Sequence, residues 1–172
     1  MFKQMGGKKM TNIIVYHGST LGVEHPIGKS GRPNLDFGQG FYVTDLRKQA
    51  TEWALLVARK RKTNPVLNKY LLRRDEILAN ARCKIFKAYD SEWLEFIVSS
   101  RLGENPSKDY DYIEGGIAND RVIDTVNLFM AGLMDSRTAL SRLAVHSPNN
   151  QMCLLTQEIT DNYLLFDGTE SI

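Results

Sequence analysis

Short apolar, β-branched runs and helical patterns follow one another irregularly along this chain, and that order most limits the folds it can adopt. The runs that predict strands comprise residues 12–16, 40–44, 66–72, 83–88, 110–115, 151–156 and 163–167. Apolar residues at helical spacing predict helices over 45–62, 91–101, 121–130 and 136–145, with a short helical turn over 156–161. A doubly wound fold needs regular alternation of strands and helices, so this order favours an α+β fold.

Size and composition predict one globular domain over residues 10–172, preceded by a disordered extension at 1–9. The 172 residues carry a formal net charge of +2, which gives no overall argument for binding nucleic acid or a membrane. No apolar run reaches the length of a membrane span, and the N-terminus lacks the apolar core of a signal peptide. The two cysteines form no disulfide or metal pattern, so we expect a cytoplasmic protein without a metal site.

Two helix starts and one buried helix face are predicted from side-chain type. Asp45 and Ser91 suit the N-cap position, because a short polar side chain there can accept from a free backbone N–H. Trp53 falls at the same helical spacing as Ala54 and Ala58. It is therefore expected on the buried, apolar face of the first helix.

His17 and Gly18 lie at the end of the first predicted strand. A histidine there can place its ring in a cleft and bond a ribose hydroxyl, since a neutral imidazole offers one donor and one acceptor. Gly18 has no Cβ, so a planar ligand can approach its backbone, whose N–H and C=O would suit a primary amide such as nicotinamide. Taken alone, the pair is better explained as a hydrogen-bonded core histidine beside a turn glycine.

The segment Gly38-Gln39-Gly40-Phe41-Tyr42 combines paired glycines, which permit a tight turn, with the start of a strand. Alternation puts Phe41 and Tyr42 on opposite faces of that strand, one in the core and the other lining a cleft. Tyr42 and Trp53 could sandwich a flat ring, with each stack worth about 0.5–1.5 kcal/mol. Without other segments to support a cleft, both are better explained as core residues.

Gln151 begins the predicted strand near the C-terminus. Alternation puts Met152 and Leu154 on one face of this strand, and Gln151 and Cys153 on the other. An amide among apolar neighbours needs partners, because an unsatisfied buried polar group costs about 1–3 kcal/mol. Taken alone, Gln151 is explained as a strand-end residue bonded to local backbone.

Three segments in a fixed order nevertheless resemble the NAD-binding cleft of ADP-ribosyltransferases of the diphtheria-toxin and poly-ADP-ribose-polymerase type. The segments similar to the three motifs of the His-Tyr-Glu transferases are Val15-Tyr16-His17-Gly18-Ser19, Phe37-Gly38-Gln39-Gly40-Phe41-Tyr42-Val43-Thr44 and Asn150-Gln151-Met152-Cys153-Leu154. The strings similar to the bacterial domain-of-unknown-function 3990 family are Asp36-Phe37-Gly38-Gln39-Gly40-Phe41-Tyr42 and Ile117-Ala118-Asn119-Asp120. The similarity covers residues 12–166.

This resemblance implies a split β-sheet core with flanking helices around an NAD cleft, with NAD as co-substrate and no metal. His17 would bond the adenosine-side ribose, Gly18 would clamp the nicotinamide amide, and Ser19 would complete the first motif. The glycosidic bond to nicotinamide would break through an oxocarbenium-like state, and ADP-ribose would pass to a nucleophile.

The resemblance also implies roles for a helix and a loop. Tyr42 would stack on the nicotinamide ring together with Trp53, which falls where poly-ADP-ribose polymerases carry a second stacking tyrosine. The loop over 18–35 would border the cleft, and its Lys29 and Arg32 would meet the pyrophosphate.

The third motif position holds Gln151, where the transferases carry a catalytic glutamate. A glutamine can orient the ribose hydroxyl, but it cannot act as a general base or stabilise the developing cation with a full charge. Three explanations stay open: the acceptor needs no base, another carboxylate serves, or the cleft binds NAD without turnover. Asp120 is the first candidate carboxylate and Glu158 the second, although Asp120 alone is better explained as the N-cap of the helix starting at Arg121.

We therefore expect a toxin-like mono-ADP-ribosyltransferase that modifies a macromolecular acceptor, either a protein or a nucleic acid. A small neutralising partner protein is expected to accompany such an activity. An NAD glycohydrolase, with water as the acceptor, is one alternative. A non-catalytic NAD-binding or protein-interaction module is the other.

Overall fold

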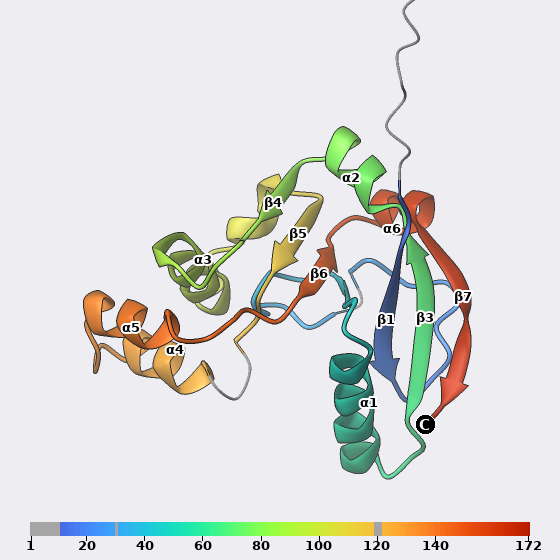
Figure 1. The fold of residues 1–172 in the computed structure, drawn as a ribbon, viewed down its shortest axis with the longest axis horizontal. Helices are drawn as coiled ribbons and strands as arrows, with labels where there is room; N and C mark the ends of the chain where they lie inside the picture. Colours follow the sequence, from blue (N-terminus) through green and yellow to red (C-terminus); the bar gives the residue numbers. More distant parts are fainter. Residues whose placement is uncertain (1–10, 30, 119–121) are drawn as a thin grey trace, which may run out of the picture.

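The computed structural model describes residues 11–29, 31–118 and 122–172, which form an α+β fold with two β-sheets (Figure 1). The expected extension at 1–9 lies outside the described residues. The three-stranded antiparallel sheet consists, in spatial order, of β1 (Ile13–Ser19), β3 (Val66–Leu72) and β7 (Leu164–Ser171). The four-stranded sheet consists of β2 (Phe41–Val43), β6 (Gln151–Leu154), β5 (Tyr112–Gly115) and β4 (Cys83–Ile85).

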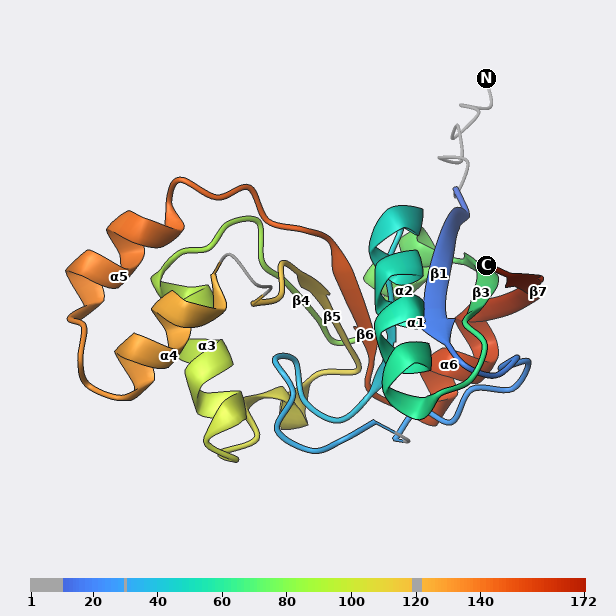
Figure 2. The same cartoon turned by 90° about the horizontal axis from the view of Figure 1, so that it is seen from below.

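Helices flank both sheets. Within the described ranges they are α1 (Arg47–Arg61), α2 (Arg74–Asn80), α3 (Ser91–Arg101), α4 (Ile123–Met130), α5 (Ser136–Leu143) and α6 (Gln157–Tyr163), with a 3-10 turn at Pro106–Asp109. Figure 1 shows α3, α4 and α5 gathered at the outer side of the four-stranded sheet, and Figure 2 shows α1 alongside β1. No helix in the described ranges combines the length and the apolar character that crossing a bilayer needs.

Side chains on the two faces of the four-stranded sheet belong to two different hydrophobic clusters. Met152 and Leu154 lie in a cluster that draws on both sheets, whereas Cys153 between them lies in a second cluster with residues of α3, α4 and α5. Tyr112 and Ile113 of β5 divide between the clusters in the same way. The predicted separation of Met152 and Leu154 from Cys153 is therefore confirmed, and one face of this sheet looks toward β1 while the other looks toward the helices.

The two sheets meet at an isolated bridge between β1 and the residue after β2. Tyr16 N donates to Thr44 O at 2.7 Å, and Thr44 N donates to Tyr16 O at 3.0 Å. The Thr44 hydroxyl donates to Asn150 O at 2.6 Å and accepts from Leu46 N at 3.1 Å. One residue thus joins the three-stranded sheet, the start of β6 and the start of α1.

Helix α1 lies unusually close to β1, because small residues meet at the contact. Its buried residues are Ala50, Ala54 and Ala58. A Cβ added to Gly18 would lie 2.0 Å from Ala50 O and 2.8 Å from Ala54 N. The space left by the missing side chain of Gly18 is therefore filled by α1.

Trp53 is not on the buried face of α1, so that prediction is wrong. Its side chain is 49% exposed. The close contact with β1 admits alanine and leaves no room for an indole, so the helix is rotated to place Trp53 at its solvent side.

The N-caps of two helices differ from the prediction, and one helix was not predicted. The N-cap of α1 is Leu46 without a side-chain hydrogen bond, and not Asp45. The N-cap of α3 is Asp90, which accepts from Trp93 N at 2.9 Å, and not Ser91. Helix α2 escaped prediction because its only buried residue is Ile77, which leaves no apolar periodicity to detect.

Helix α2 is held by a buried ion pair instead of an apolar stripe. Arg74 Nε and Nη2 donate to the two carboxylate oxygens of Glu114 at 2.7 and 3.1 Å. The Tyr112 hydroxyl donates to the same carboxylate at 2.7 Å. Glu114 is buried, so these donors replace the water that its charge would otherwise require.

The contact between α1 and β1 predicts that Gly18→Ala destabilises the protein by about 1–3 kcal/mol, because the new methyl group would overlap the Ala50 carbonyl. The free energy of unfolding from denaturant titration measures this effect. Gly22→Ala is the control, since its Cβ would meet only Thr169 Cγ2 at 3.3 Å. We expect that control to change stability by no more than about 0.5 kcal/mol. Equal stability of the two variants would contradict the close helix–strand contact.

Candidate functional site

The ladder between β1 and β2 stops after a single bridge among the described residues, and this interruption forms the centre of the candidate site. Backbone groups of alternate residues in a strand point to the same side. Because Tyr16 and Thr44 bond each other, the next pair in that register, Gly18 and Tyr42, also turns backbone N–H and C=O groups toward the space between the sheets. No backbone bond between Gly18 and Tyr42 is found in the described chain, so the Gly18 amide groups face a gap.

His17 occupies part of this gap. Its Nδ1 lies 2.7 Å from Tyr42 O, and its ring packs on Phe41 with the ring centroids 4.5 Å apart. A carbonyl oxygen can only accept, so Nδ1 carries the proton and Nε2 of the neutral ring is an acceptor. No partner of Nε2 is found among the residues that the structure describes. Burial lowers the pKa of His17 despite the opposing effect of the Tyr42 hydrogen bond, which keeps the ring neutral.

Tyr42 is half-buried and its hydroxyl is fully engaged. The hydroxyl donates to Gly38 O at 2.7 Å and accepts from Phe37 N at 3.1 Å. Burial, followed by the neighbouring Cys153, raises the pKa of the Tyr42 phenol, so it remains a donor. Burial also raises the pKa of Cys153 to about 12, and this thiol is therefore no nucleophile at neutral pH. Tyr42 can offer a ligand its ring, and not its hydroxyl.

Gln151 lies on the same sheet face as Tyr42. Tyr42 pairs with Cys153, so Gln151 is its diagonal neighbour across the β2–β6 ladder. The Gln151 side chain is half-buried, and its Oε1 accepts from Gln49 Nε2 at 2.8 Å. Gln49 belongs to α1 and lies one helical turn before Trp53, which places both on one side of that helix.

The structure thus brings together part of the predicted set. Gly18, Tyr42 and Gln151 share one side of the strands, with Trp53 on the adjoining helix. The His17 ring lies against Phe41, which belongs to the opposite face, and reaches the others through the Tyr42 carbonyl.

The remaining predicted residues lie elsewhere or are not described. Ser19 ends β1, and its hydroxyl accepts from Leu21 N at 3.4 Å. Arg32 is exposed on the loop between β1 and β2, as is Lys29. Glu158 is exposed in the first turn of α6. Asp120 lies outside the described residues.

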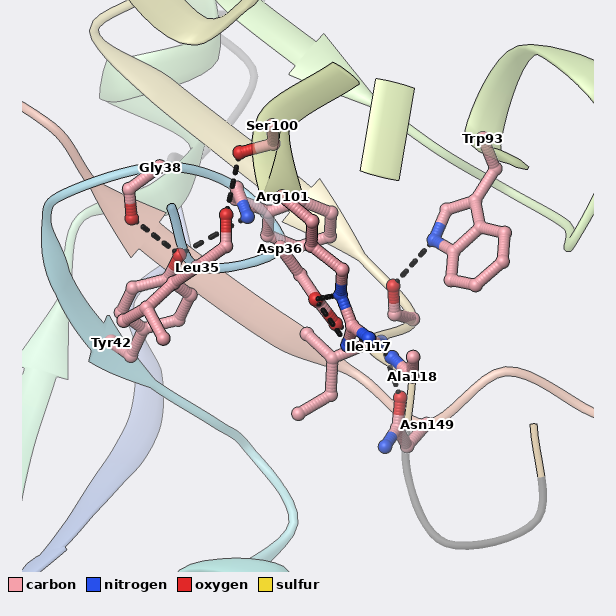
Figure 3. A network of polar contacts seen from close by, with 12 residues as sticks. Leu35, Asp36, Gly38, Tyr42, Trp93, Ser100, Arg101, Ile117, Ala118 and Asn149 are labelled. Atoms are coloured by element: carbon pink, nitrogen blue, oxygen red, sulfur yellow. Dashed lines mark hydrogen bonds and ion pairs between the residues drawn. The ribbon is translucent and has the colours of Figure 1, made fainter. Parts of the chain in front are cut away.

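Asp36, the first residue of the glycine-rich motif, serves the fold. Arg101 donates to Asp36 Oδ1 from Nε at 2.8 Å and from Nη2 at 2.7 Å (Figure 3). Ala118 N donates to Asp36 Oδ2 at 2.8 Å, and Ser100 Oγ donates to the neighbouring Leu35 O at 2.5 Å. Both carboxylate oxygens are occupied, so Asp36 fastens the motif loop to α3 and to the segment after β5.

Asn149 fastens the same segment from the other side. Its Oδ1 accepts from Ile117 N at 2.8 Å and from the Tyr89 hydroxyl at 3.3 Å. Trp93 Nε1 donates to Gly116 O at 2.7 Å (Figure 3). Asp36, just before the second motif, and Asn149, just before the third, therefore both hold the segment after β5, at Ala118 and Ile117.

Hydrogen bonds hold the loop between β1 and β2 at several points. Asn68 Oδ1 accepts from Val23 N at 2.7 Å, and Gln157 Oε1 accepts from Gly28 N at 2.9 Å. Gln39 Nε2 donates to Lys29 O at 3.0 Å and to Gly31 O at 2.8 Å. These bonds keep the loop against the sheets, although its described residues form no helix or strand.

An open pocket of about 250 Å³ lies where this loop meets the end of α3. Its lining comprises Pro33, Asn34, Gly38, Gln39, Ser100 and Asn105. None of the residues assigned to NAD from the sequence lines it, so this pocket is separate from the gap at Gly18.

The sequence did not predict the roles of Gln49 and Arg101, or that Thr44 joins the two sheets. Gln49 carries no motif signal, since its partner is 102 positions away in the sequence. Thr44 stands within the second motif, and its β-branched side chain is explained equally well by strand propensity. Only contacts between segments far apart in the chain reveal the roles of these residues.

Comparison with known families identifies one match. The model of the family described as "Protein of unknown function (DUF3990)" matches residues 13–166. The comparisons with curated proteins and with solved structures give no match.

His17 predicts a pH dependence of stability. Its pKa is lowered from the ordinary 6.5 in the folded protein, so the unfolded chain binds the proton more readily. The His17 contribution is fully present above pH 6.5 and is lost as the pH falls through the folded-state pKa. His17→Asn keeps an N–H donor for the Tyr42 carbonyl and cannot titrate.

Denaturant titrations from pH 8 to 5 should show the wild type losing up to about 1.4 kcal/mol for each pH unit in this window relative to His17→Asn. His25→Asn, at a side chain that is 93% exposed, should follow the wild type. Parallel pH profiles for wild type and His17→Asn would contradict the buried neutral imidazole.

Proposed function

We propose that this chain, which belongs to the DUF3990 family, is an NAD-dependent mono-ADP-ribosyltransferase that modifies a macromolecular acceptor. The observation that carries the proposal is the interrupted β1–β2 ladder. It leaves the Gly18 backbone and the acceptor nitrogen of His17 without partners among the described residues, at the join of the two sheets. Unpaired backbone groups at a partly buried site need a polar ligand or water, and a dinucleotide offers matching groups.

The nicotinamide end of NAD matches the groups around Gly18. A carboxamide has one N–H₂ donor and one C=O acceptor, which pair with the C=O and N–H that Gly18 turns to the gap. Tyr42 offers its ring on the same side, since its hydroxyl is held by Gly38 and Phe37. The exposed Trp53 indole gives a second flat surface one turn beyond Gln49. An exposed ring at this position is available to stack on a ligand.

His17 suits a ribose hydroxyl. Because Nδ1–H is held by the Tyr42 carbonyl, Nε2 can accept a hydrogen bond from a hydroxyl group. The lowered pKa keeps Nε2 an acceptor at neutral pH. In this proposal His17 orients the adenosine-side ribose while Gly18 holds the nicotinamide.

The transfer would break the bond between ribose C1′ and the nicotinamide nitrogen, and the bonding electrons would leave with nicotinamide. An acceptor nucleophile would then bond to C1′ of the oxocarbenium-like sugar and lose its proton. Gln151 would hold the nicotinamide-side ribose as a neutral amide. It adds no charge to stabilise the cation, so the reaction depends on binding geometry and on leaving-group orientation.

A non-catalytic NAD-binding module is the second candidate, and Gln151 itself favours it. Its Oε1 already accepts one hydrogen bond from Gln49, and a neutral amide can neither take a proton from the acceptor nor place a charge near the sugar. A site built in this way would bind the dinucleotide more readily than it would cleave it.

The first test combines NAD affinity with nicotinamide release, with and without cell lysate. We expect NAD to bind the wild type and nicotinamide to be released with lysate, because the acceptor is macromolecular. His17→Asn should weaken NAD affinity by about tenfold, as one hydrogen bond is lost. His25→Asn is the matched control and should leave affinity unchanged.

Release without lysate would instead indicate a glycohydrolase or automodification. Binding without release would indicate the non-catalytic module. Absence of NAD binding to the folded wild type would refute the proposal.

Gln151→Glu is predicted to raise the rate of NAD cleavage by about tenfold or more, because a carboxylate can stabilise the cationic transition state. Single-turnover nicotinamide release measures the chemical step directly. Gln151→Met, which keeps the length of the side chain and removes its polar groups, should show no gain. Loss of all cleavage in Gln151→Glu, with folding and NAD binding intact, would mean that the neutral amide is itself required.

A further inference from the structure

The hydrogen bond between Gln49 and Gln151 is the most specific side-chain contact at the candidate site that no motif predicts. Gln49 Nε2 lies 2.8 Å from Gln151 Oε1, and both side chains are half-buried. A hydrogen bond in a partly buried setting is stronger than one in water, so this contact fixes the orientation of both amides.

Gln49 is itself held firmly. The Thr44 hydroxyl accepts from Leu46 N at 3.1 Å and so anchors the start of α1. Ala50, the next residue after Gln49, lies against Gly18 without space for a side chain between them. Arg47, on the same helix as Gln49, forms an ion pair with Glu170 of β7. The backbone that carries Gln49 is therefore fixed beside Gln151, and the donor role of Gln49 rests on the hydrogen bond itself.

The orientation decides what Gln151 can offer to a ligand. A primary amide has one acceptor oxygen and one N–H₂ group. Gln49 bonds one lone pair of the oxygen and so sets the direction of the amide, which leaves the two N–H donors of Gln151 for a ligand. An amide in this state binds an oxygen that accepts, such as a ribose hydroxyl oxygen, and does not draw a proton from it.

We propose that Gln49 is a positioning residue that turns the Gln151 amide so that its N–H₂ group faces the bound nucleotide. This inference rests on the proposed NAD site for its ligand, although the orientation of the two amides can be tested without NAD. It names the recognised group as an acceptor oxygen of the nicotinamide-side ribose. It also makes the gain expected from Gln151→Glu depend on Gln49, because Gln49 Nε2 would hold one oxygen of the new carboxylate and leave the other for the ribose.

Two substitutions at Gln49 test separately whether this side chain must donate to Gln151 or accept from it. Gln49→Lys can only donate and should keep the Gln151 amide in place. Gln49→Glu can only accept, so Gln151 must reverse its amide to bond it and would then turn its oxygen toward the ligand.

Charge-matched controls lie on the same helix. Lys48→Gln lowers the net charge by one, as Gln49→Glu does, and Glu52→Gln raises it by one, as Gln49→Lys does. Lys48 and Glu52 form an exposed pair 3.7 Å apart, and a pair of this kind contributes little to stability.

The orientation is measured first, by hydrogen exchange of the side-chain amides in nitrogen-labelled protein without NAD. In the wild type, the Gln49 N–H₂ group should be protected and the Gln151 N–H₂ group should exchange rapidly. In Gln49→Glu, the Gln151 N–H₂ group should become protected. Protection of Gln151 and rapid exchange of Gln49 in the wild type would overturn the assigned orientation.

NAD affinity is measured next, together with melting temperature. Gln49→Glu should weaken NAD binding by about tenfold relative to Lys48→Gln at equal melting temperature, since the ribose oxygen loses its N–H donor and the hydroxyl must turn its own proton toward Gln151. Gln49→Lys should match Glu52→Gln. Equal affinities for Gln49→Glu and Lys48→Gln would overturn the positioning role. If the wild type binds no NAD, the proposed function fails, and the exchange pattern still decides whether Gln49 orients Gln151.

Discussion

The arrangement of this protein depends on the hydrogen bonds made by Thr44. Its backbone forms the bridge to Tyr16, and its hydroxyl connects Asn150 with the start of α1. The two sheets and α1 are thereby fixed at one point, while the strands separate immediately beyond it. A gap opens there because His17 takes the Tyr42 carbonyl that a continued ladder would have given to Gly18. The candidate site is a consequence of how the sheets are joined.

Strand alternation determines which groups reach that gap. Phe41 turns into the core shared by both sheets and supports the His17 ring, whereas Tyr42 turns to the other face. Gln151 lies diagonally opposite Tyr42 on that face and meets Gln49 of α1. A catalytic role for this set depends on a neutral amide pair, which distinguishes it from a site built on a carboxylate. The same pair explains why binding and turnover must be measured separately.

Several residues in or beside the motifs have a structural role. Asp36 has both oxygens engaged by Arg101 and Ala118, and Asn149, which precedes the third motif, holds Ile117. Gly18 lacks a Cβ because α1 occupies the space. A recognisable sequence string therefore mixes residues that face the gap with residues that fix the loops around it. Only the contact partners of each side chain separate the two kinds, because both occur in the same short strings.

The sequence by itself determined the α+β class, most strands and the division of β6 between two faces, since these follow from local apolar periodicity. It also brought forward His17, Tyr42 and Gln151 as candidates. It could not place Trp53 correctly, find Gln49 or detect α2. Those depend on the tight packing of α1 against Gly18, on pairing between β2 and β6 over more than a hundred residues, and on the Arg74–Glu114 ion pair. Such contacts join residues far apart in the chain, so only the tertiary structure decides them.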